Sequence, residues 1–491
     1  MSRNHFVLML LLAACTSAAL ATNGIRMVGF TPVSVGRGGT ALGIFDRPSL
    51  MMSNPAGLSF LTGSSLDVNF SLMVPALKFT NALNSADGKT NYFPLPGVAY
   101  ATTAEDLAWG VGVFTQGGMG ADFLLKHALF PSAQEYHSKL AVMQGGPAVA
   151  YKLSPALSLG LSAHIVYSMM DFTMPYSLSP LAMRGIAQPG MTFGQMFAAP
   201  PAQGGFGYTE VTAAARMPDL TAFGFNGKVG LAWQATPSVT IGLSYSTPVP
   251  LTFKGGKAGM DMTAQMNDAF GKAVAGYMAQ NPSATQQQAQ AAVMANFAGL
   301  GIDISKGVVA SYNLEAKLTL PQTIGIGASW KLSELVILAA DLEWVNWKDA
   351  FDTMTLNLSG GSNTNINTMM GNNGSFTMEF PMYWANSFNI RLGGEYVASH
   401  MVTLRAGYAY GANPVPASTI FPVFPAVVEN HLMIGATLGL SESMGLNLAY
   451  EMALNKSQKA SAQSIVAQEY NGSTSELAEN IFHISLSWKL K

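Results

Sequence analysis

The sequence predicts an all-β protein: a 14-stranded antiparallel transmembrane β-barrel with an N-terminal segment, or hatch, plugging the lumen and short helices in the extracellular loops. Charged residues make up 11% of the chain, against roughly 25% in typical soluble proteins. After the N-terminal region, no stretch approaches the ~20 uninterrupted apolar residues that a membrane-spanning helix needs. Alternation of residue types and the lengths of the connections complete the prediction.

The N-terminus predicts export. Arg3 precedes an apolar run over 6–14, and the small residues at 19–21 supply a cleavage site, so residues 1–21 are expected to be a signal peptide. Cys15, the only cysteine, would be removed with it, and the mature protein would form no disulfide. The segment ending in Cys15 also resembles a lipoprotein processing site, so lipidation of this cysteine is the alternative.

Apolar and polar residues alternate with period two, which is typical of β-strands. The clearest run lies near the C-terminus, where Phe482, Ile484 and Leu486 alternate with His483 and Ser485. A soluble β-sandwich would show the same alternation. The periodicity therefore predicts strands but does not by itself distinguish a sandwich from a barrel.

The connection lengths favour a barrel over 63–491. Six tight turns alternate with seven long connections, which gives thirteen links and fourteen strands. All tight turns then lie at one end and all long loops at the other, as in outer-membrane barrels. The tight turns are expected at Ala104-Glu105, Ser154-Pro155, Thr236-Pro237, Ser333-Glu334, Ser399-His400 and Glu442-Ser443, and the long connections near 81–91, 119–137, 176–220, 256–311, 357–383, 411–427 and 456–477.

Charged residues within the predicted strands are expected to face the lumen. Hydrocarbon penalises a charge on the lipid face by a few kcal/mol, so the inward direction is nearly forced. The signs of these charges are mixed, which favours ion pairs that brace the lumen; direct contact with a ligand is the alternative. The residues are Asp341, Glu343, Arg391, Glu395, Arg405 and Glu451.

Residues 22–62 do not alternate and are expected to form the plug. Glycine and turn residues concentrate at 36–39, 46–49 and 54–57. The lumen of a closed fourteen-stranded barrel is too wide for its own side chains to fill. A compact segment before the first strand is the natural candidate to occlude it.

Several segments resemble the long-chain fatty acid outer-membrane transporter (FadL-type) family, which includes aromatic hydrocarbon transporters. The strongest likeness is to the hatch of that family, and other likenesses follow in register with the predicted strands. The segments are 34–41 followed by Asp46 and Asn54-Pro55-Ala56-Gly57-Leu58, Leu107-Ala108-Trp109-Gly110 leading to Gln116-Gly117-Gly118, Leu251-Thr252-Phe253-Lys254-Gly255, and Asn413-Pro414-Val415-Pro416. The chain departs from the family where Trp488 is followed by Lys489-Leu490-Lys491 rather than ending on an aromatic residue.

The resemblance implies a monomeric barrel that carries hydrophobic compounds inward without an energy source, through a side exit at a kinked third strand. The kink would fall at Gly117 and Gly118, since glycines suit a bulge or gap in strand pairing; a strand that simply ends there is the alternative. In the hatch, Asn54-Pro55-Ala56 is the family mark. We expect Asn54 to cap or cross-bond the plug and Pro55 to fix its turn, rather than to contact a ligand.

The two longest predicted loops, 176–220 and 256–311, carry more apolar residues than water-facing loops need. Met262, Met266 and Phe270 begin a stripe at helical spacing. By resemblance, helices in these loops would form a groove that first captures the ligand, and flexible methionines suit varied apolar guests. Packing of the two loops as a lid is the alternative. The candidate groove residues are Phe193, Met196, Phe197, Met262, Met266 and Phe270.

The predicted function is passive uptake of a small hydrophobic molecule, a long-chain fatty acid or an aromatic hydrocarbon, across the outer membrane of a Gram-negative bacterium. Expected partners are the ligand and membrane lipid; a net charge of −2 gives no reason to expect nucleic acid, and neither cofactor nor metal is expected. A non-transporting barrel that acts as an adhesin or receptor is the alternative. A secreted lipid-modifying enzyme is disfavoured, because no nucleophile, zinc or phosphate-loop motif occurs.

Overall fold

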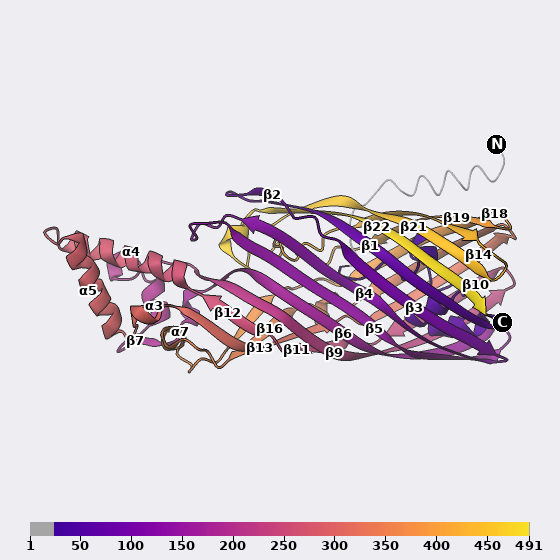
Figure 1. Cartoon of the computed structure of the whole chain (residues 1–491), viewed down its shortest axis with the longest axis horizontal. Helices are drawn as coiled ribbons and strands as arrows, with labels where there is room; N and C mark the ends of the chain where they lie inside the picture. Colours follow the sequence, from indigo (N-terminus) through magenta and orange to yellow (C-terminus); the bar gives the residue numbers. More distant parts are fainter. Residues whose placement is uncertain (1–23, 491) are drawn as a thin grey trace.

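The computed structural model describes residues 24–490; the predicted signal peptide and Cys15 lie outside the described residues. Strands wind around one elongated barrel, and helices gather at one end of it (Figure 1). The barrel is closed because β1 (Ser64–Thr80) pairs along its whole length with β22 (Thr474–Leu490) and also pairs with β3 (Phe93–Ala104). All pairs between strands are antiparallel.

Fourteen spans form the wall in the described part of the chain, which confirms the predicted fold class. Ten spans are single strands and four are interrupted. The single strands are β1, β3, β4 (Leu107–Leu125), β5 (Gln134–Ser154), β6 (Leu157–Leu178), β9 (Val211–Thr236), β19 (Val402–Gly411), β20 (Asn430–Gly439), β21 (Met444–Lys459) and β22. The interrupted spans are β10 (Val239–Ser246) with β11 (Val249–Phe253) and β12 (Lys257–Asp261), β13 (Val309–Leu320) with β14 (Thr323–Ser333), β15 (Val336–Val345) with β16 (Thr353–Ser359), and β17 (Phe376–Pro381) with β18 (Ser387–Ser399).

Side-chain direction follows the barrel pattern. Along β14, Thr323, Gly325 and Gly327 point inward, while Ile324 and Ile326 are exposed on the outer surface. A soluble sandwich would bury the apolar side instead. The apolar outer surface is therefore the side that meets lipid.

All six predicted tight turns occur, and they share the end of the barrel opposite the helices (Figure 1). Five of the seven long connections are shorter than predicted, because their strands continue past the bilayer. The predicted connection 119–137 shrinks to 126–133, since residues 119–125 remain in β4, with inward side chains packed in a large apolar cluster. A span needs only about 9–11 residues, so strands such as the 26-residue β9 project well beyond the membrane.

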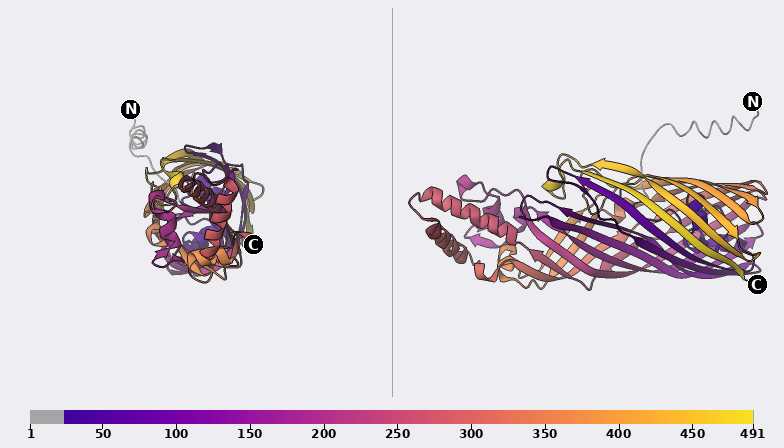
Figure 2. Two further views of the ribbon diagram at one scale, coloured as in Figure 1. Left: turned by 90° about the vertical axis from the view of Figure 1, so that its left-hand side faces the viewer. Right: turned by 45° about the horizontal axis from the view of Figure 1, so that its top comes forward.

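Short helices lie in the long loops, as predicted: α3 (Phe193–Ala198), α4 (Thr263–Gln280), α5 (Gln286–Gly299) and α7 (Thr364–Met370). The view onto this end shows the loop helices in front of the barrel (Figure 2, left). A capping box between Thr285 and Gln288 starts α5. Among the described residues, no helix combines the length and apolar character needed to cross a membrane.

Candidate functional site

The N-terminal residues 24–62 lie within the barrel. Helix α2 (Pro32–Gly36) contacts β19 to β22, and the 3₁₀ segments η1 (Pro48–Met52) and η2 (Pro55–Phe60) contact strands on other sides of the wall. Pro32 and Pro55 each occupy the first turn of their helical segment, where the missing N–H costs nothing. The segment therefore occludes the lumen near the end with the tight turns.

The Asn54 side chain is fully buried and bonds both the plug and the wall. Its Nδ2 donates to the carbonyl oxygen of Leu42 (2.9 Å), within the plug, and to that of Leu231 (3.0 Å), on β9. Its Oδ1 accepts from the backbone N–H of Ala56 (3.3 Å) and caps η2. The side chain of Asn54 therefore holds three backbone groups in place, two in the plug and one in the wall.

Glycines of the wall allow this part of the plug to approach closely, and no motif in the sequence pointed to them. A Cβ atom on Gly160 would lie 2.3 Å from the Ala56 nitrogen, and one on Gly230 would lie 2.1 Å from the Asn54 Oδ1. Both distances are far below contact, so the plug approaches the wall only where side chains are absent. Glycine at inward-facing strand positions was the available sequence signal.

Two predicted lumen charges, Asp341 and Glu343, bind the plug, and a third, Arg391, pairs with Glu343. Glu343 lies between two cations, with Arg26 Nη2 at 3.0 Å and Arg391 Nη2 at 2.8 Å. Asp341 accepts the backbone N–H groups of Ala41 (2.8 Å) and Leu42 (3.0 Å). The ion pairs thus join strand residues to the plug.

A second cluster holds another part of the plug. Glu395 accepts from Arg405 Nε (2.6 Å) and lies 3.3 Å from Arg37 Nη1, which also pairs with Asp46 at 2.7 Å. Glu451, the remaining predicted lumen charge, contacts histidines of adjacent strands instead of the plug. These placements fit the predicted bracing of the lumen.

The predicted kink coincides with an irregularity in β4. The register between β4 and β5 shifts between Thr115 and Gly117, and β4 continues to Leu125 instead of ending at the glycines. The plug pairs with β4 here: Gly118 donates its N–H to the Ile25 carbonyl oxygen (2.9 Å). A Cβ on Gly117 would lie 2.0 Å from the same oxygen, so glycine is required for this approach.

The wall is open beside this irregularity. Strand β3 pairs with β4 only from Gly97–Phe114 down to the tight turn, whereas its outer part pairs with β1. Pro94 and Pro96 lie in that outer part and cannot donate backbone hydrogen bonds to a neighbouring strand. The β3–β4 ladder therefore ends at Phe114, just before the predicted kink glycines.

A cavity of about 290 Å³ occupies this gap and is lined mainly by apolar side chains. On the lumen side it contacts Ile25 and Leu140, and on the outer side Met143 and Met169. Both predicted kink glycines also line it. The cavity therefore connects the inside of the barrel to its lipid-facing surface.

The candidate groove residues are packed among other loop side chains. On α3, Phe193 and Phe197 are fully buried and Met196 nearly so, and Phe197 contacts Phe206 with ring centroids 5.1 Å apart. This packing agrees with the lid alternative for these positions.

On and before α4, the candidate groove residues differ in burial. Met262 lines a small apolar cavity of about 30 Å³, while Met266 and Phe270 are half-buried. The ring of Phe270 lies against Phe297 of α5, with ring centroids 6.1 Å apart. A groove would require movement of these helices.

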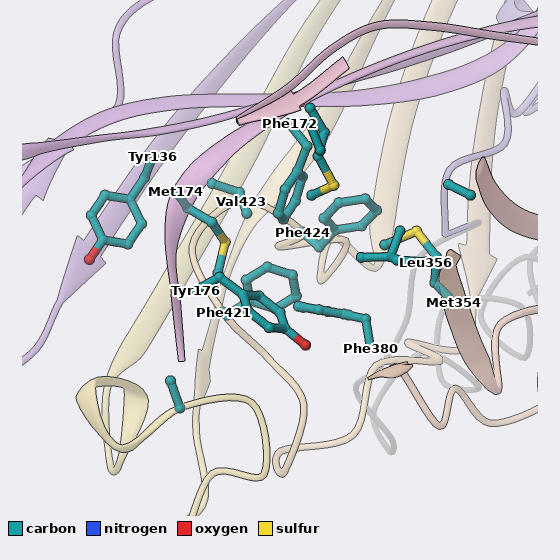
Figure 3. Packing of buried hydrophobic residues seen from close by; sticks show 14 of the residues in the cluster. Tyr136, Phe172, Met174, Tyr176, Met354, Leu356, Phe380, Phe421, Val423 and Phe424 are labelled. Carbon is teal, nitrogen blue, oxygen red and sulfur yellow. The ribbon is translucent and has the colours of Figure 1, made fainter. Parts of the chain in front are cut away.

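The sequence predicts a long external connection near 411–427. In the structure the connection is 412–429, and its apolar part folds into the barrel. Phe421 and Phe424 pack beside Phe172 and Phe380 (Figure 3). Ser138 on β5 donates its hydroxyl to a backbone carbonyl of the loop at 2.5 Å. The apolar run 420–428 was the missed signal, because side chains of this kind are buried where a hydrophobic interior is available.

A closed barrel with an apolar outer surface, a plugged lumen and a cavity through its wall defines a transmembrane protein of the outer-membrane type. The family model for outer membrane protein transport protein (OMPP1/FadL/TodX) matches residues 13–488. The chain therefore belongs to this family. Its place is the outer membrane of a Gram-negative bacterium, and its family comprises transport proteins, not enzymes.

Solved structures share the fold. The chain superposes on the toluene transporter TodX of Pseudomonas putida with a TM-score of 0.67 and 18% identity, covering 96% of this chain and 100% of that one. A FadL homologue of Pseudomonas aeruginosa gives a TM-score of 0.69 at 17% identity, with 95% and 100% covered. The Ralstonia pickettii toluene transporter TbuX gives 0.62 at 18%, with 93% and 98% covered. No curated protein matches the sequence.

Proposed function

We propose that this protein is a passive channel for small hydrophobic molecules, which enter through the loops, reach the apolar cavity beside β4 and leave sideways into the membrane. The cavity at the gap between β3 and β4 supports this proposal most directly. The free energy of an apolar molecule changes little when it moves from this cavity into lipid, because both surroundings exclude water. Its own concentration gradient then suffices to drive the movement.

The plug supports a sideways path over a straight one. Toward the periplasm the lumen holds Asn54, the ion pairs of Glu343 and Glu395, and close contacts with wall glycines. An apolar molecule moving straight down would have to break these polar contacts. The wall cavity offers mainly apolar contacts instead, so the lower free-energy route runs through the wall.

The guest is a long-chain fatty acid or an aromatic hydrocarbon. Relatives named as toluene transporters support the aromatic class, and the relative named as a FadL homologue supports the fatty-acid class. The loop residues around Phe193 and Met262 are proposed as the entry groove after an opening movement. The protein is proposed to act as a monomer.

A reversible cross-link across the gap tests the proposal. Thr115 donates its hydroxyl to the Pro96 carbonyl at 3.3 Å, so these positions are neighbours just beyond the last β3–β4 pair. Liposomes that contain Pro96→Cys/Thr115→Cys should take up oleate or toluene several-fold more slowly when oxidised, and recover when reduced. Residues 24–490 contain no cysteine, so the introduced pair can react only with itself.

A matched disulfide separates closure of the gap from a general effect of cross-linking. Leu404 and Ala436 are register partners on β19 and β20, in a continuous part of the wall. Leu404→Cys/Ala436→Cys should leave uptake unchanged in both redox states. Uptake by the wild type no faster than by empty liposomes, over the whole panel of compounds, would contradict transport and favour the adhesin or receptor alternative.

A further inference from the structure

The outer face of the wall carries a second hollow next to the cavity. It is an open groove of about 560 Å³ on strands β3 to β6, within the roughly 300–1,000 Å³ range of small-molecule sites. Its sides are the outward-facing residues Val111 and Val113 of β4 and Ile165 and Tyr167 of β6. We call this feature the wall groove.

An irregularity of β5 creates the wall groove. The β5–β6 ladder is interrupted between the pairs Gly145–Ile165 and Ala148–Ser162, across Gly146 and Pro147. Gly145 and Gly146 line the floor and bring no side chains to it. Larger side chains flank this floor on the neighbouring strands, so a barrel wall that is otherwise convex becomes concave here.

Strand register makes the wall groove continuous with the cavity. Thr115, Met143 and Met169 form the outer mouth of the cavity, and Met143 also lines the groove. Thr115 pairs with Met143, and the next outward-facing pair along the same strands is Val113 with Gly145. The groove therefore begins where the cavity ends and runs toward the tight turn at residue 105.

We propose that the wall groove is a binding site for the apolar part of the transported molecule after it has passed through the wall. This inference rests on the proposed function and adds a site outside the barrel. A molecule in the groove contacts protein on three sides, whereas a molecule on a flat wall contacts protein on one side. Dispersion attraction is therefore stronger in the groove. A molecule that leaves the cavity thus keeps protein contact until it exchanges with membrane lipid.

A resident lipid acyl chain is the competing occupant. The continuity with the cavity favours the transported molecule, because that molecule reaches the groove at Met143 without first mixing with bulk lipid. A resident lipid chain would have to be displaced at each passage. The two occupants predict different behaviour under competition.

Photolabelling identifies the occupant. Proteoliposomes with wild-type protein receive a diazirine-bearing fatty acid from outside, are illuminated briefly and are analysed by peptide mass spectrometry. Adducts on Ile165 should exceed those on Leu161 several-fold. These residues are matched controls, because both are on β6, face lipid and are 56% exposed, but only Ile165 lines the groove.

Excess unlabelled oleate should remove the preference for Ile165, whereas excess phospholipid should not. Equal labelling of the two residues, or a preference that only phospholipid removes, overturns the proposal. If either of these labelling results is found together with rapid uptake, the groove is not a binding site but the transport proposal is unaffected. Absent uptake would instead contradict the proposed function, so the two failures are distinguishable.

Filling the groove supplies an independent measurement. Val113→Trp should occupy the space above Gly145 and slow uptake several-fold, while Leu161→Trp, on lipid-facing wall outside the groove, should leave it unchanged. Heat-dependent mobility on gels reports whether each variant folds. If Val113→Trp does not fold, the labelling of the wild type decides; equal uptake by both folded variants contradicts the proposal.

Discussion

Buried polar side chains hold the plug in the lumen at separate points. Asn54 fixes backbone groups, Asp341 accepts two N–H groups, and Glu343 and Glu395 each bind arginines of the plug and of the wall. Each contact is protected from lipid and largely from water. Their strength therefore depends on geometry and on complete pairing.

Asn54→Ala should loosen the plug. The change leaves the carbonyl groups of Leu42 and Leu231 without their side-chain donor, and a buried polar group left unsatisfied costs about 1–3 kcal/mol. We expect a lower unfolding temperature and higher ion conductance in planar bilayers. Asn69→Ala is the control, because buried Asn69 forms no side-chain hydrogen bond within residues 24–490; equal effects of the two changes would refute the assigned role.

Glu343→Gln should be strongly destabilising. It leaves Arg26 and Arg391 buried without their carboxylate, and breaking a buried ion pair costs about 3–5 kcal/mol. The matched change Glu315→Gln also removes a carboxylate that lies between two cations, Lys254 and Lys317, but at the surface. Thermal unfolding in detergent should distinguish them, with little change for the surface variant.

Among the elements, the extracellular loops show the greatest departure from simple connections. The loop 412–429 enters the barrel, and the loop that contains η6 (Gln468–Tyr470) forms backbone hydrogen bonds with it. Partly buried Glu469 of η6 accepts a hydrogen bond from Tyr136 of β5 at 2.6 Å, and Glu210 of the α3 loop accepts the N–H of Gln468. These contacts join the η6 loop to β5 and to the α3 loop.

The contact between the η6 loop and β5 at Glu469 should weaken as pH rises. Burial, and then the negative charge of Glu210, raise the pKa of Glu469 from 4.5 to about 7. The folded surroundings of Glu469 thus favour its neutral acid, although the hydrogen bond from Tyr136 opposes this shift. The resulting stabilisation is complete below pH 4.5 and is lost as pH rises through about 7. The other titratable neighbours are Tyr136, Tyr470 and His127, the last of which has a pKa lowered by burial.

A spin label on Gln463→Cys, in the same loop, measures this effect. Its mobility should increase between pH 5 and pH 8 in an otherwise wild-type chain. Adding Glu469→Gln, which cannot ionise, should remove the increase. A label that responds equally in both backgrounds would show that another group controls the loop.

In the whole molecule, a membrane-embedded half with tight turns joins a long outer half with helices (Figure 2, right). The embedded half places its apolar side chains outward and its polar groups inward, whereas the outer half encloses a large apolar cluster. Closure between β1 and β22 leaves no unpaired first or last strand. The departure from the family at the C-terminus does not disturb this closure, since Leu490 pairs with Ser64.

The folded protein should require detergent or a bilayer. The outer surface exposes residues such as Phe223, Phe225 and Ile434, which would aggregate in water. In detergent the protein should migrate differently on gels before and after boiling, because a closed barrel resists unfolding by SDS at room temperature. A monodisperse, folded chain in detergent-free buffer would contradict the assigned membrane exposure.

The barrel, its fourteen spans and the positions of its tight turns were predictable from patterns along the chain. These features depend on the alternation of residue types and on the lengths of the connections, both of which can be read along the chain: the inward direction of Asp341 and the turn at Glu105 follow from their immediate neighbours. The location of the kink at Gly117 came from family resemblance. Residues 420–428 are visibly apolar in the sequence. The sequence does not show, however, which part of the folded protein buries them.

The contacts between distant parts of the chain follow from the three-dimensional fold and were not predictable from these patterns. The approach of Asn54 to Gly230, the ion pair of Arg26 with Glu343, and the junction of the cavity with the wall groove at Met143 join residues far apart in sequence or on separate strands. Barrel closure and strand register fix these distances, and a local pattern contains neither. The wall opens where the β3–β4 ladder stops, because pairing depends on both strands and is invisible in either one alone.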